Sequence, residues 1–292
     1  MKRNTLVKGM NTLAITNALT HENNSVTIGK ELGEGNFAIV YHGRCGAIEV
    51  AVKILKIEDA AAIKIYEQEK KIMAIISECQ ADDPNEHVVK FFGCAKREPI
   101  LVMEYLPGGD LIKNICEGDI TMQESYQIAA DVANGLAFLH KHNIIHCDLK
   151  PDNILLTQTQ SDKTKRAKIA DFGFAKLEED LEQKQMLIEG TPDYCAPEIL
   201  TSGYYSKKSD VYAKGMTDFI LFTRSAPYDN DIPDSKIIRS VIQGKRPTIP
   251  DDCPSSIKKL ITHCWMQDPD SRPTAQETVE YLDEEMKKTF KY

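Results

Sequence analysis

The chain has 292 residues, of which 42% are hydrophobic and 27% are charged, and its formal net charge at pH 7 is −8. These proportions are ordinary for a soluble globular protein, and the length suits one large domain or two lobes. The acidic balance argues against a nucleic-acid partner, and no stretch reaches the roughly 18 uncharged apolar residues of a membrane span.

Residues 1–26 carry no recognisable motif and are predicted to be an N-terminal extension. The first residues resemble the positive start of a signal peptide, but Lys8, Asn11 and Thr12 interrupt the apolar stretch that should follow. The eight cysteines show neither paired spacing nor a zinc-ligand pattern. We therefore expect free thiols and a cytoplasmic, intracellular location.

A strand, a glycine-containing turn and a second strand are predicted between Ile28 and Gly43. The turn consists of Gly33, Glu34, Gly35, Asn36, Phe37 and Ala38. Glycine lets backbone amides approach phosphate oxygens without a Cβ in the way, although two glycines in a hairpin are also a common turn. The sequence that follows fits neither a P-loop nor a dinucleotide-binding fold, because it lacks the lysine signature of the first and the helix of the second.

A third strand, residues 50–53, ends in Lys53. This lysine could place a cation above phosphates, or it could simply be exposed on an edge strand. The helix predicted between Asp59 and Glu78 carries an apolar stripe of Ile65, Ile72, Met73 and Ile76, and Glu69 falls on that stripe. A carboxylate on a buried face is costly unless it is paired, so we expect Glu69 to meet Lys53.

Two more strands are predicted at residues 87–93 and 100–105. Proline and glycine at residues 107–109 then break the strand, and a helix begins near Leu111. Asp110 stands at the N-cap position of this helix. A longer amphipathic helix follows, with an apolar stripe of Ile128, Val132, Leu136 and Leu139.

The segment with the most residues suited to catalysis is 145–153, which reads IHCDLKPDN. The tripeptide DFG follows at residues 171–173. Phosphoryl transfer requires a carboxylate to orient a hydroxyl, a cation for the transferring phosphate, and oxygen ligands for Mg²⁺. Asp148, Lys150 and the pair Asn153 and Asp171 are residues of these types.

In this order, the glycine turn, the strand ending in lysine, HxDLKPDN, DFG and APE at residues 196–198 resemble the eukaryotic-type protein kinases. The resemblance runs from about Val26 to about Leu282. It implies an α+β, bilobal fold with a kinase domain at residues 27–288. The small β-rich N-lobe, residues 27–106, would carry one main helix, and the larger C-lobe, residues 107–288, would be helical.

The resemblance also implies ATP and Mg²⁺ as cofactors. Glu104 to Leu106 would form the hinge that bonds adenine, Met103 would be the gatekeeper, and Asp110 would lie near the ribose as well as, or instead of, capping its helix. The implied nucleotide-binding residues are Gly33, Glu34, Gly35, Asn36, Phe37, Ala38, Val40, Ala51, Lys53, Met103, Glu104, Leu106, Asp110 and Leu155. Ala38 replaces the third glycine of the family's loop, a position that tolerates a small residue.

The family pattern assigns catalysis to Asp148, Lys150, Lys53 and Glu69, and Mg²⁺ binding to Asn153 and Asp171. Asp148 would orient the attacking hydroxyl, and Lys150 would neutralise charge on the γ-phosphate. His146 and Phe172 are expected to be packing residues.

Lys150 and Thr191 match the pattern of serine/threonine kinases. The dipeptides CW, DP and RP within residues 264–273 are similar to those of the tyrosine-kinase-like branch. Arg272 is expected to pair with Glu198. Lys214 and Asp218 depart from that branch, because those helix positions are usually apolar. The sequence leaves open whether they mark an interface or looser packing.

Cys147 stands where most members of the family have arginine. In many kinases that arginine binds a phosphate on the activation segment and orders it. Residues 174–190 contain no serine, threonine or tyrosine, so the usual phosphate acceptor is also missing. We therefore predict independence from phosphorylation of this segment. We also expect an inert thiol at Cys147, because nearby carboxylates disfavour the thiolate.

The sequence as a whole predicts an ATP- and Mg²⁺-dependent kinase acting on protein substrates that bear serine or threonine. The alternative is a kinase-like nucleotide-binding scaffold or switch with little turnover. Its usual mark, loss of Lys53, Asp148 or a metal ligand, is absent. The substrates and the oligomeric state stay open.

Overall fold

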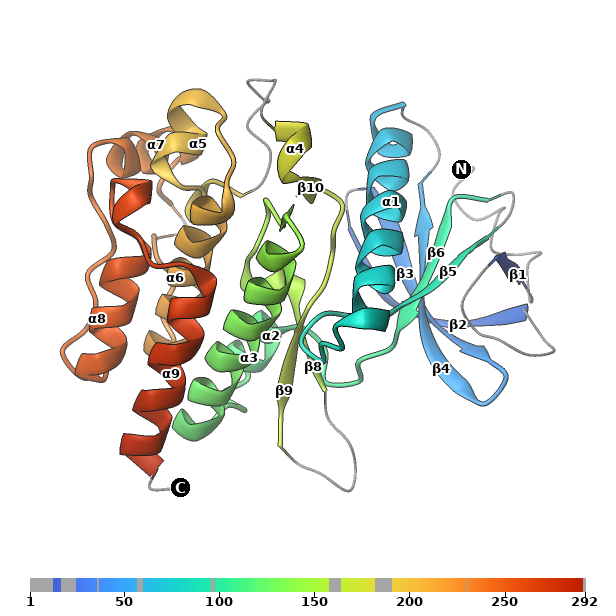
Figure 1. Cartoon of the computed structure of the whole chain (residues 1–292), viewed down its shortest axis with the longest axis horizontal. Coiled ribbons are helices and arrows are strands. Elements are labelled where there is room, and N and C mark those ends of the chain that lie inside the picture. Colours follow the sequence, from blue (N-terminus) through green and yellow to red (C-terminus); the bar gives the residue numbers. More distant parts are fainter. Residues whose placement is uncertain are drawn as a thin grey trace. The chain divides into compact units, whose positions relative to one another are not determined.

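The computed structural model describes residues 13–16, 25–35, 37–56, 60–95, 98–157, 164–181, 191–229 and 231–290. The chain divides into two compact units (Figure 1). The first comprises Met1–Pro84 and Val89–Leu106, and the second comprises Asn85–Val88 and Pro107–Tyr292. The first is rich in strands and the second is mostly helical, which confirms the predicted α+β, bilobal class.

The first unit is built on an antiparallel sheet with the strand order β1-β2-β3-β4-β6-β5. Its strands are β1 Leu13–Thr16, β2 Ser25–Glu34, β3 Ala38–Cys45, β4 Ile48–Leu55, β5 Phe91–Ala95 and β6 Ile100–Glu104. β1 pairs with both β2 and β5, which closes the sheet into a barrel. This strand lies in the segment expected to be an extension, where the sequence pattern had indicated no element.

Alternating apolar residues fill the interior of this sheet. Val26, Val50, Val52 and Val102 are fully buried in one cluster, as expected for β-branched residues on a pleated surface. Gly43 on β3 is required by the packing, because a Cβ there would lie 2.7 Å from the carbonyl oxygen of Thr27 and 2.8 Å from Val52. The β2, β3 and β4 strands are therefore closely packed around Gly43.

Within the described part of the first unit, the one long helix is α1, Ala60–Asp82. Ile72, Met73 and Ile76 are buried as the stripe predicts, whereas Ile65 is only half-buried. Tyr66 takes the buried position instead, three residues before the buried Glu69. The predicted buried positions are therefore confirmed from Ile72 onward, and at the start of the stripe the buried residue is Tyr66 instead of Ile65.

The second unit contains eight α-helices and four short strands among its described residues. The helices are α2 Leu111–Cys116, α3 Met122–Lys141, α4 Glu178–Leu181, α5 Pro197–Ser202, α6 Lys207–Thr223, α7 Asp234–Ile242, α8 Ser255–Cys264 and α9 Ala275–Phe290. The strands are β7 Ile144–Ile145, β8 Ile154–Thr157, β9 Arg166–Ile169 and β10 Lys176–Leu177. β8 pairs with β9, and β10 pairs with β7.

Helix α3 begins at a capping box, in which Thr121 and Glu124 satisfy each other's backbone amides. The four apolar residues of its predicted stripe are all buried. Gly135 lets the loop at His87 come close, because a Cβ there would lie 2.6 Å from the His87 carbonyl oxygen. The helix therefore supports that loop as well as the core.

Helix α6 carries the two charges that the sequence left unexplained. Lys214 and Asp218 are 0% and 1% exposed, and their side chains pair at 2.5 Å, one helical turn apart. Burial raises the pKa of Asp218, and Lys214 opposes that shift. Since neither side chain reaches solvent, they do not form an exposed interface. They pair with each other inside the helical core, although among the described residues Oδ1 of Asp218 has no hydrogen-bond partner.

The predicted ion pair between Glu198 and Arg272 is present and bidentate. The two guanidinium nitrogens donate to Oε1 at 2.6 Å and to Oε2 at 2.8 Å. All eight cysteines are free, as expected. Among the described residues, no helix has the length and apolar character needed to cross a bilayer.

Candidate active site

The predicted site residues fall into two groups, one in each unit. The first unit holds Gly33, Glu34, Gly35, Phe37, Ala38, Val40, Ala51, Lys53, Glu69, Met103, Glu104 and Leu106. The second holds Asp110, Asp148, Lys150, Asn153, Leu155 and Asp171. Asn36 lies outside the described residues.

The glycines of the β2–β3 turn are not required by the fold. A Cβ at Gly33 would meet no described atom within 4 Å, and one at Gly35 would meet only the Ala38 carbonyl oxygen at 3.7 Å. Neither glycine has a positive φ. Open space above a backbone without Cβ atoms is what a phosphate group needs for close approach.

Lys56 contacts three residues of this turn. Its ammonium donates to the Gly35 carbonyl oxygen at 2.7 Å and pairs with Glu34 at 2.5 Å, and its amide donates to the Phe37 carbonyl oxygen at 2.8 Å. The side chains of Lys56 and Glu34 are 33% and 51% exposed, so water screens this pair. The turn is therefore tethered, but weakly.

The predicted contact between Lys53 and Glu69 is present. The Lys53 ammonium donates to both carboxylate oxygens of Glu69, at 2.7 and 2.8 Å. Glu69 is buried at the centre of α1, whereas Lys53 keeps 19% of its side chain exposed. The buried carboxylate therefore holds the lysine ammonium in place through two charge-assisted hydrogen bonds.

The end of β6 offers backbone groups rather than side chains. Ala51 pairs with Met103 across the sheet, and both are buried. The Glu104 amide already donates to the Lys90 carbonyl oxygen at 2.9 Å. Among the described residues, neither the amide nor the carbonyl of Leu106 has a hydrogen-bond partner. A planar ligand that carries a donor and an acceptor could satisfy both groups.

In the second unit, the loop at residues 146–153 brings Asp148, Lys150 and Asn153 together. The Asn153 amide donates to the Asp148 carboxylate at 3.0 Å and to its carbonyl oxygen at 2.8 Å. The Lys150 ammonium lies 3.1 Å from the Asp148 carboxylate and donates to the Thr191 hydroxyl at 2.9 Å. Asp148 is thus a buried, oriented carboxylate with a cation beside it.

Asp210 is a positioning residue whose role the sequence analysis missed. This α6 residue is 1% exposed, and its two carboxylate oxygens accept the amides of His146 at 2.9 Å and Cys147 at 3.0 Å. The ring of His140 lies 2.9 Å from the same carboxylate. A buried aspartate two residues before a tyrosine, at the start of a helix, was the available signal, but it did not identify these partners.

His146 supports the loop through both ring nitrogens. Its Nδ1 accepts the Asp148 amide at 3.3 Å, and its Nε2 lies 3.0 Å from the Ala170 carbonyl oxygen. This arrangement requires the neutral ring with the proton on Nε2. His146 and Phe172 are both fully buried, with ring centroids 5.2 Å apart, so they are packing residues as expected.

The two predicted metal ligands lie in adjacent segments, because the Ala170 amide donates to the Asn153 carbonyl oxygen at 2.8 Å. The Asn153 amide nitrogen is committed to Asp148, which leaves its side-chain oxygen as the acceptor. Asp171 is exposed, and its φ of 59° is a strained value for a residue with a Cβ. These oxygens fit Mg²⁺, which typically takes one or two protein oxygens together with phosphates and water.

Asp110 and Leu155 lie side by side in a short antiparallel bridge. The Asp110 carboxylate accepts the Lys113 amide at 2.7 Å, so its N-cap role on α2 is shown. Because a carboxylate has two oxygens, this bond leaves one oxygen for another donor.

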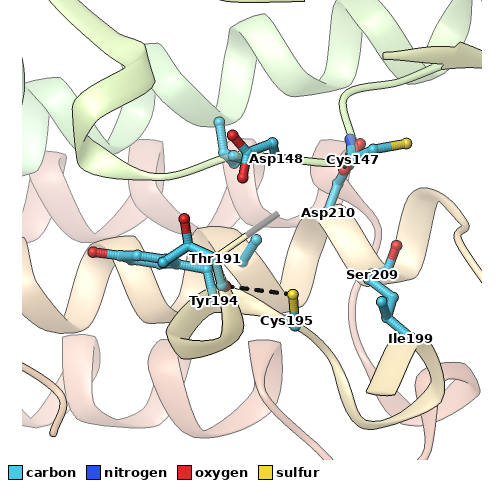
Figure 2. Close-up of a pocket in the computed structure, with 10 residues that line it drawn as sticks. Cys147, Asp148, Thr191, Tyr194, Cys195, Ile199, Ser209 and Asp210 are labelled. Atoms are coloured by element: carbon cyan, nitrogen blue, oxygen red, sulfur yellow. Dashed lines mark hydrogen bonds between the residues drawn. The ribbon is translucent and has the colours of Figure 1, made fainter. Parts of the chain in front are cut away.

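A small cavity adjoins Asp148 (Figure 2). Asp148, Tyr194, Cys195 and Asp210 are among the residues that line it. Burial raises the pKa of the Cys195 thiol to about 12, and Asp148 and Asp193 add to that shift. The thiol donates to the Thr191 carbonyl oxygen at 3.4 Å, the bond drawn in Figure 2. Cys195 is therefore protonated at neutral pH.

Cys147 is buried, has a φ of 65°, and its thiol lies 3.5 Å from the Ile145 carbonyl oxygen. It lines the same cavity. Residues 182–190, which belong to the segment without serine, threonine or tyrosine, lie outside the described residues. Among the described residues, no group of three or more His, Cys, Asp or Glu side chains could hold a metal ion.

Comparison with known proteins identifies a family to which most of the chain is similar. Residues 26–282 match the family described as protein tyrosine and serine/threonine kinase. A probable serine/threonine-protein kinase of Dictyostelium discoideum is 36% identical over 93% of this chain and 20% of its own length. The dual specificity protein kinase pyk3 of the same organism is 35% identical over 91% of this chain and 19% of its own length.

The serine/threonine-protein kinase STY46 of Arabidopsis thaliana is 32% identical over 88% of this chain and 43% of its own length. The chain therefore spans less than half the length of each of these three relatives.

Proposed function

The chain belongs to the protein tyrosine and serine/threonine kinase family, and we propose that it transfers the γ-phosphate of ATP, in the presence of Mg²⁺, to serine and threonine hydroxyls of proteins. The observation that carries this proposal is the cluster of Asp148, Lys150 and Asn153, with Lys150 also bound to Thr191. A structural role alone would not require a buried carboxylate, a cation and an amide group at one point.

The first unit would bind the nucleotide. The unpartnered backbone groups of Leu106 fit the donor and acceptor edge of adenine, and the buried Ala51 and Met103 provide an apolar wall. The open turn at Gly33 and Gly35 suits the phosphates. Lys53, fixed by Glu69, would supply a cation to them.

The second unit would supply the chemistry. Asp148, oriented by Asn153, would accept a hydrogen bond from the attacking hydroxyl and aim its oxygen at phosphorus. Lys150 would stabilise negative charge on the transferring group. Asn153 and Asp171 would hold Mg²⁺, which neutralises charge on the phosphates when it is bound. Most of the rate enhancement would then come from positioning and charge neutralisation.

The bond from Lys150 to the Thr191 hydroxyl supports serine and threonine as the acceptors, because that lysine and threonine are the residues that mark this group in the family. Two relatives are named as serine/threonine kinases and one as a dual specificity kinase. Phosphoamino-acid analysis of a labelled generic basic protein decides the matter. We expect phosphoserine and phosphothreonine, with phosphotyrosine at background.

The experiment that tests the proposal is transfer of label from γ-labelled ATP by the purified chain. Lys53→Met should lower the rate by about two orders of magnitude or more, because it removes the cation at the phosphates. If the wild-type chain binds ATP but transfers no label above that variant, it is a nucleotide-binding scaffold and the proposal fails.

We further propose that activity does not require phosphorylation between residues 174 and 190. Cys147 cannot bind a phosphate as arginine does, and it is buried. The segment offers no hydroxyl to modify. Cys147→Ala should therefore retain activity within about twofold, since neither residue binds an anion. Loss of most activity in that variant, with an unchanged melting temperature, would contradict the inert role.

A further inference from the structure

We propose that Glu178 and Lys207 form a permanent tether that positions the start of the activation segment, doing without modification what a phosphate bound to arginine does elsewhere. This inference rests on the proposed function. It concerns two positioning residues that neither the family pattern nor the catalytic cluster includes.

The tether begins where the segment after DFG pairs with the chain before the catalytic loop. Strand β10 runs antiparallel to β7, with Lys176 opposite Ile145 and Leu177 opposite Ile144. The pairing continues one residue further, because the Glu178 amide donates to the Asn143 carbonyl oxygen at 2.9 Å. Two residues of strand are too few to hold a segment by themselves.

Lys207 closes this junction with its side chain. Its ammonium lies 2.7 Å from the Glu178 carboxylate and donates to the Asn143 side-chain oxygen at 2.8 Å. One cation thus binds the segment and the turn that precedes the catalytic loop at the same time. Asn143 adopts a φ of 56°, a left-handed conformation that asparagine tolerates better than most residues.

The helix that carries Lys207 also carries the anchor of the catalytic loop. Lys207 is the first residue of α6, and Asp210 in the same turn accepts the amides of His146 and Cys147. The first turn of α6 therefore binds both sides of one junction. Asp210 fixes the loop, and Lys207 fixes the segment that must lie beside it.

Glu178 and Lys207 would replace the phosphate and the arginine that this part of the chain lacks. A kinase that orders the segment by phosphorylation needs a phosphate acceptor and an exposed arginine. This chain has neither hydroxyls in residues 174–190 nor arginine at position 147. Glu178 supplies the carboxylate, and Lys207 supplies the cation from a different element, at 2.7 Å. Their junction needs no second enzyme.

The expected effect is moderate, because the pair is partly exposed. The side chains of Glu178 and Lys207 are 43% and 32% accessible to solvent, so salt and water screen the attraction. We expect removal of either charge to lower kcat/KM for a protein substrate about threefold to fivefold. The KM for ATP should not change, because neither residue belongs to the nucleotide-binding set.

The chain offers matched controls for both residues. Glu179 is the next residue of α4 and is exposed, and Lys236 is exposed in the first turn of α7. Glu178→Gln is therefore compared with Glu179→Gln, and Lys207→Gln with Lys236→Gln. Each pair of variants changes the net charge equally, but only one member breaks the tether. Melting temperatures confirm that all variants fold.

Three measurements decide the proposal. We expect Glu178→Gln and Lys207→Gln to lose activity relative to their controls, Lys207→Arg to keep it, and the double variant with Glu178→Lys and Lys207→Glu to recover at least half of it. Hydrogen exchange of residues 174–181 should speed up in the two tether variants and not in the controls. In about 0.5 M salt the difference between the variants should shrink.

The proposal is overturned if Glu178→Gln and Glu179→Gln have the same kcat/KM, or if the exchanged pair does not recover activity. A wild-type chain without phosphate transfer would instead contradict the proposed function. Because the exchange measurement needs no substrate, it reports on the tether in either case, and the two failures can be told apart.

Discussion

The catalytic loop and the glycine turn are both held by a charged residue, but the two tethers differ in burial. Asp210 is 1% exposed and accepts two backbone amides of the loop, whereas Lys56, at 33% exposure, holds the turn with help from a half-exposed Glu34. Buried hydrogen bonds to a charge are strong and costly to break, and exposed ion pairs contribute little. We therefore expect the loop at Asp148 to be held more firmly than the turn between β2 and β3.

The largest expected effect comes from removing the buried tether. Asp210→Ala leaves the amides of His146 and Cys147 without acceptors in the core, which should lower the free energy of unfolding by about 3–5 kcal/mol. The catalytic rate should fall about 100-fold or more even at low temperature, where the variant is folded. Urea unfolding and single-turnover kinetics measure the two effects. A stable variant with normal turnover would show that the loop is held by other contacts.

Glycines in the first unit provide the next comparison. Gly43→Ala should lower the free energy of unfolding by about 1–3 kcal/mol, because its Cβ would collide with the Thr27 carbonyl. Gly33→Ala should leave stability unchanged within about 0.5 kcal/mol. It should raise the KM for ATP several-fold, since the methyl group takes space that the phosphates need. If both variants lowered stability equally, the account that only Gly43 lacks space for a side chain would be contradicted.

Acid should weaken the second unit through His87. Burial lowers the pKa of this histidine from its ordinary 6.5, and Asp131 and Glu86 pull it upward while Arg166 pulls it downward. The unfolded chain therefore binds a proton at a pH where the folded chain does not. Stability is fully present above about pH 6.5 and falls as the pH drops below that value.

The comparison of wild type with His87→Gln tests this point. Urea midpoints at pH 7.5 and 5.5 should differ less for the variant than for the wild type, since the variant has no proton to take up. An equal loss in both proteins would assign the acid sensitivity to carboxylates instead.

The smallest effect is expected from the exposed tether. Lys56→Ala should change the free energy of unfolding by no more than about 1 kcal/mol and the KM for ATP by about twofold to threefold. Lys64→Ala, which removes an exposed lysine from α1, serves as the control for the charge change. A loss as large as that of Asp210→Ala would show that burial does not separate the two tethers.

Ion pairs of charged residues at buried positions were predictable from the sequence. A carboxylate on the apolar stripe of a helix had to be paired, and Glu69 indeed meets Lys53. The pair Glu198 and Arg272 followed from the family pattern. Lys214 and Asp218 stood out in the sequence as charges at usually apolar positions, but only the structure shows that they pair and that both are buried.

Contacts set by tertiary packing could not be read in the same way. Asp210 lies far along the chain from His146, and no periodicity joins a helix start to a loop before it. The same holds for Lys207 and Glu178, whose pairing depends on β10 lying against β7. Strand β1 was missed because four residues give too short a pattern for periodicity to identify.

The most direct test of the central claim is a single-turnover measurement of γ-phosphate transfer by the wild type and Asp148→Asn, with ATP affinity measured on both. The variant keeps the shape of the side chain and loses its charge. We predict a rate lower by about 10³-fold or more, equivalent to about 4 kcal/mol of activation free energy, with ATP affinity unchanged within about twofold. A transfer rate within tenfold of the wild type would contradict the role of Asp148 and the proposed mechanism.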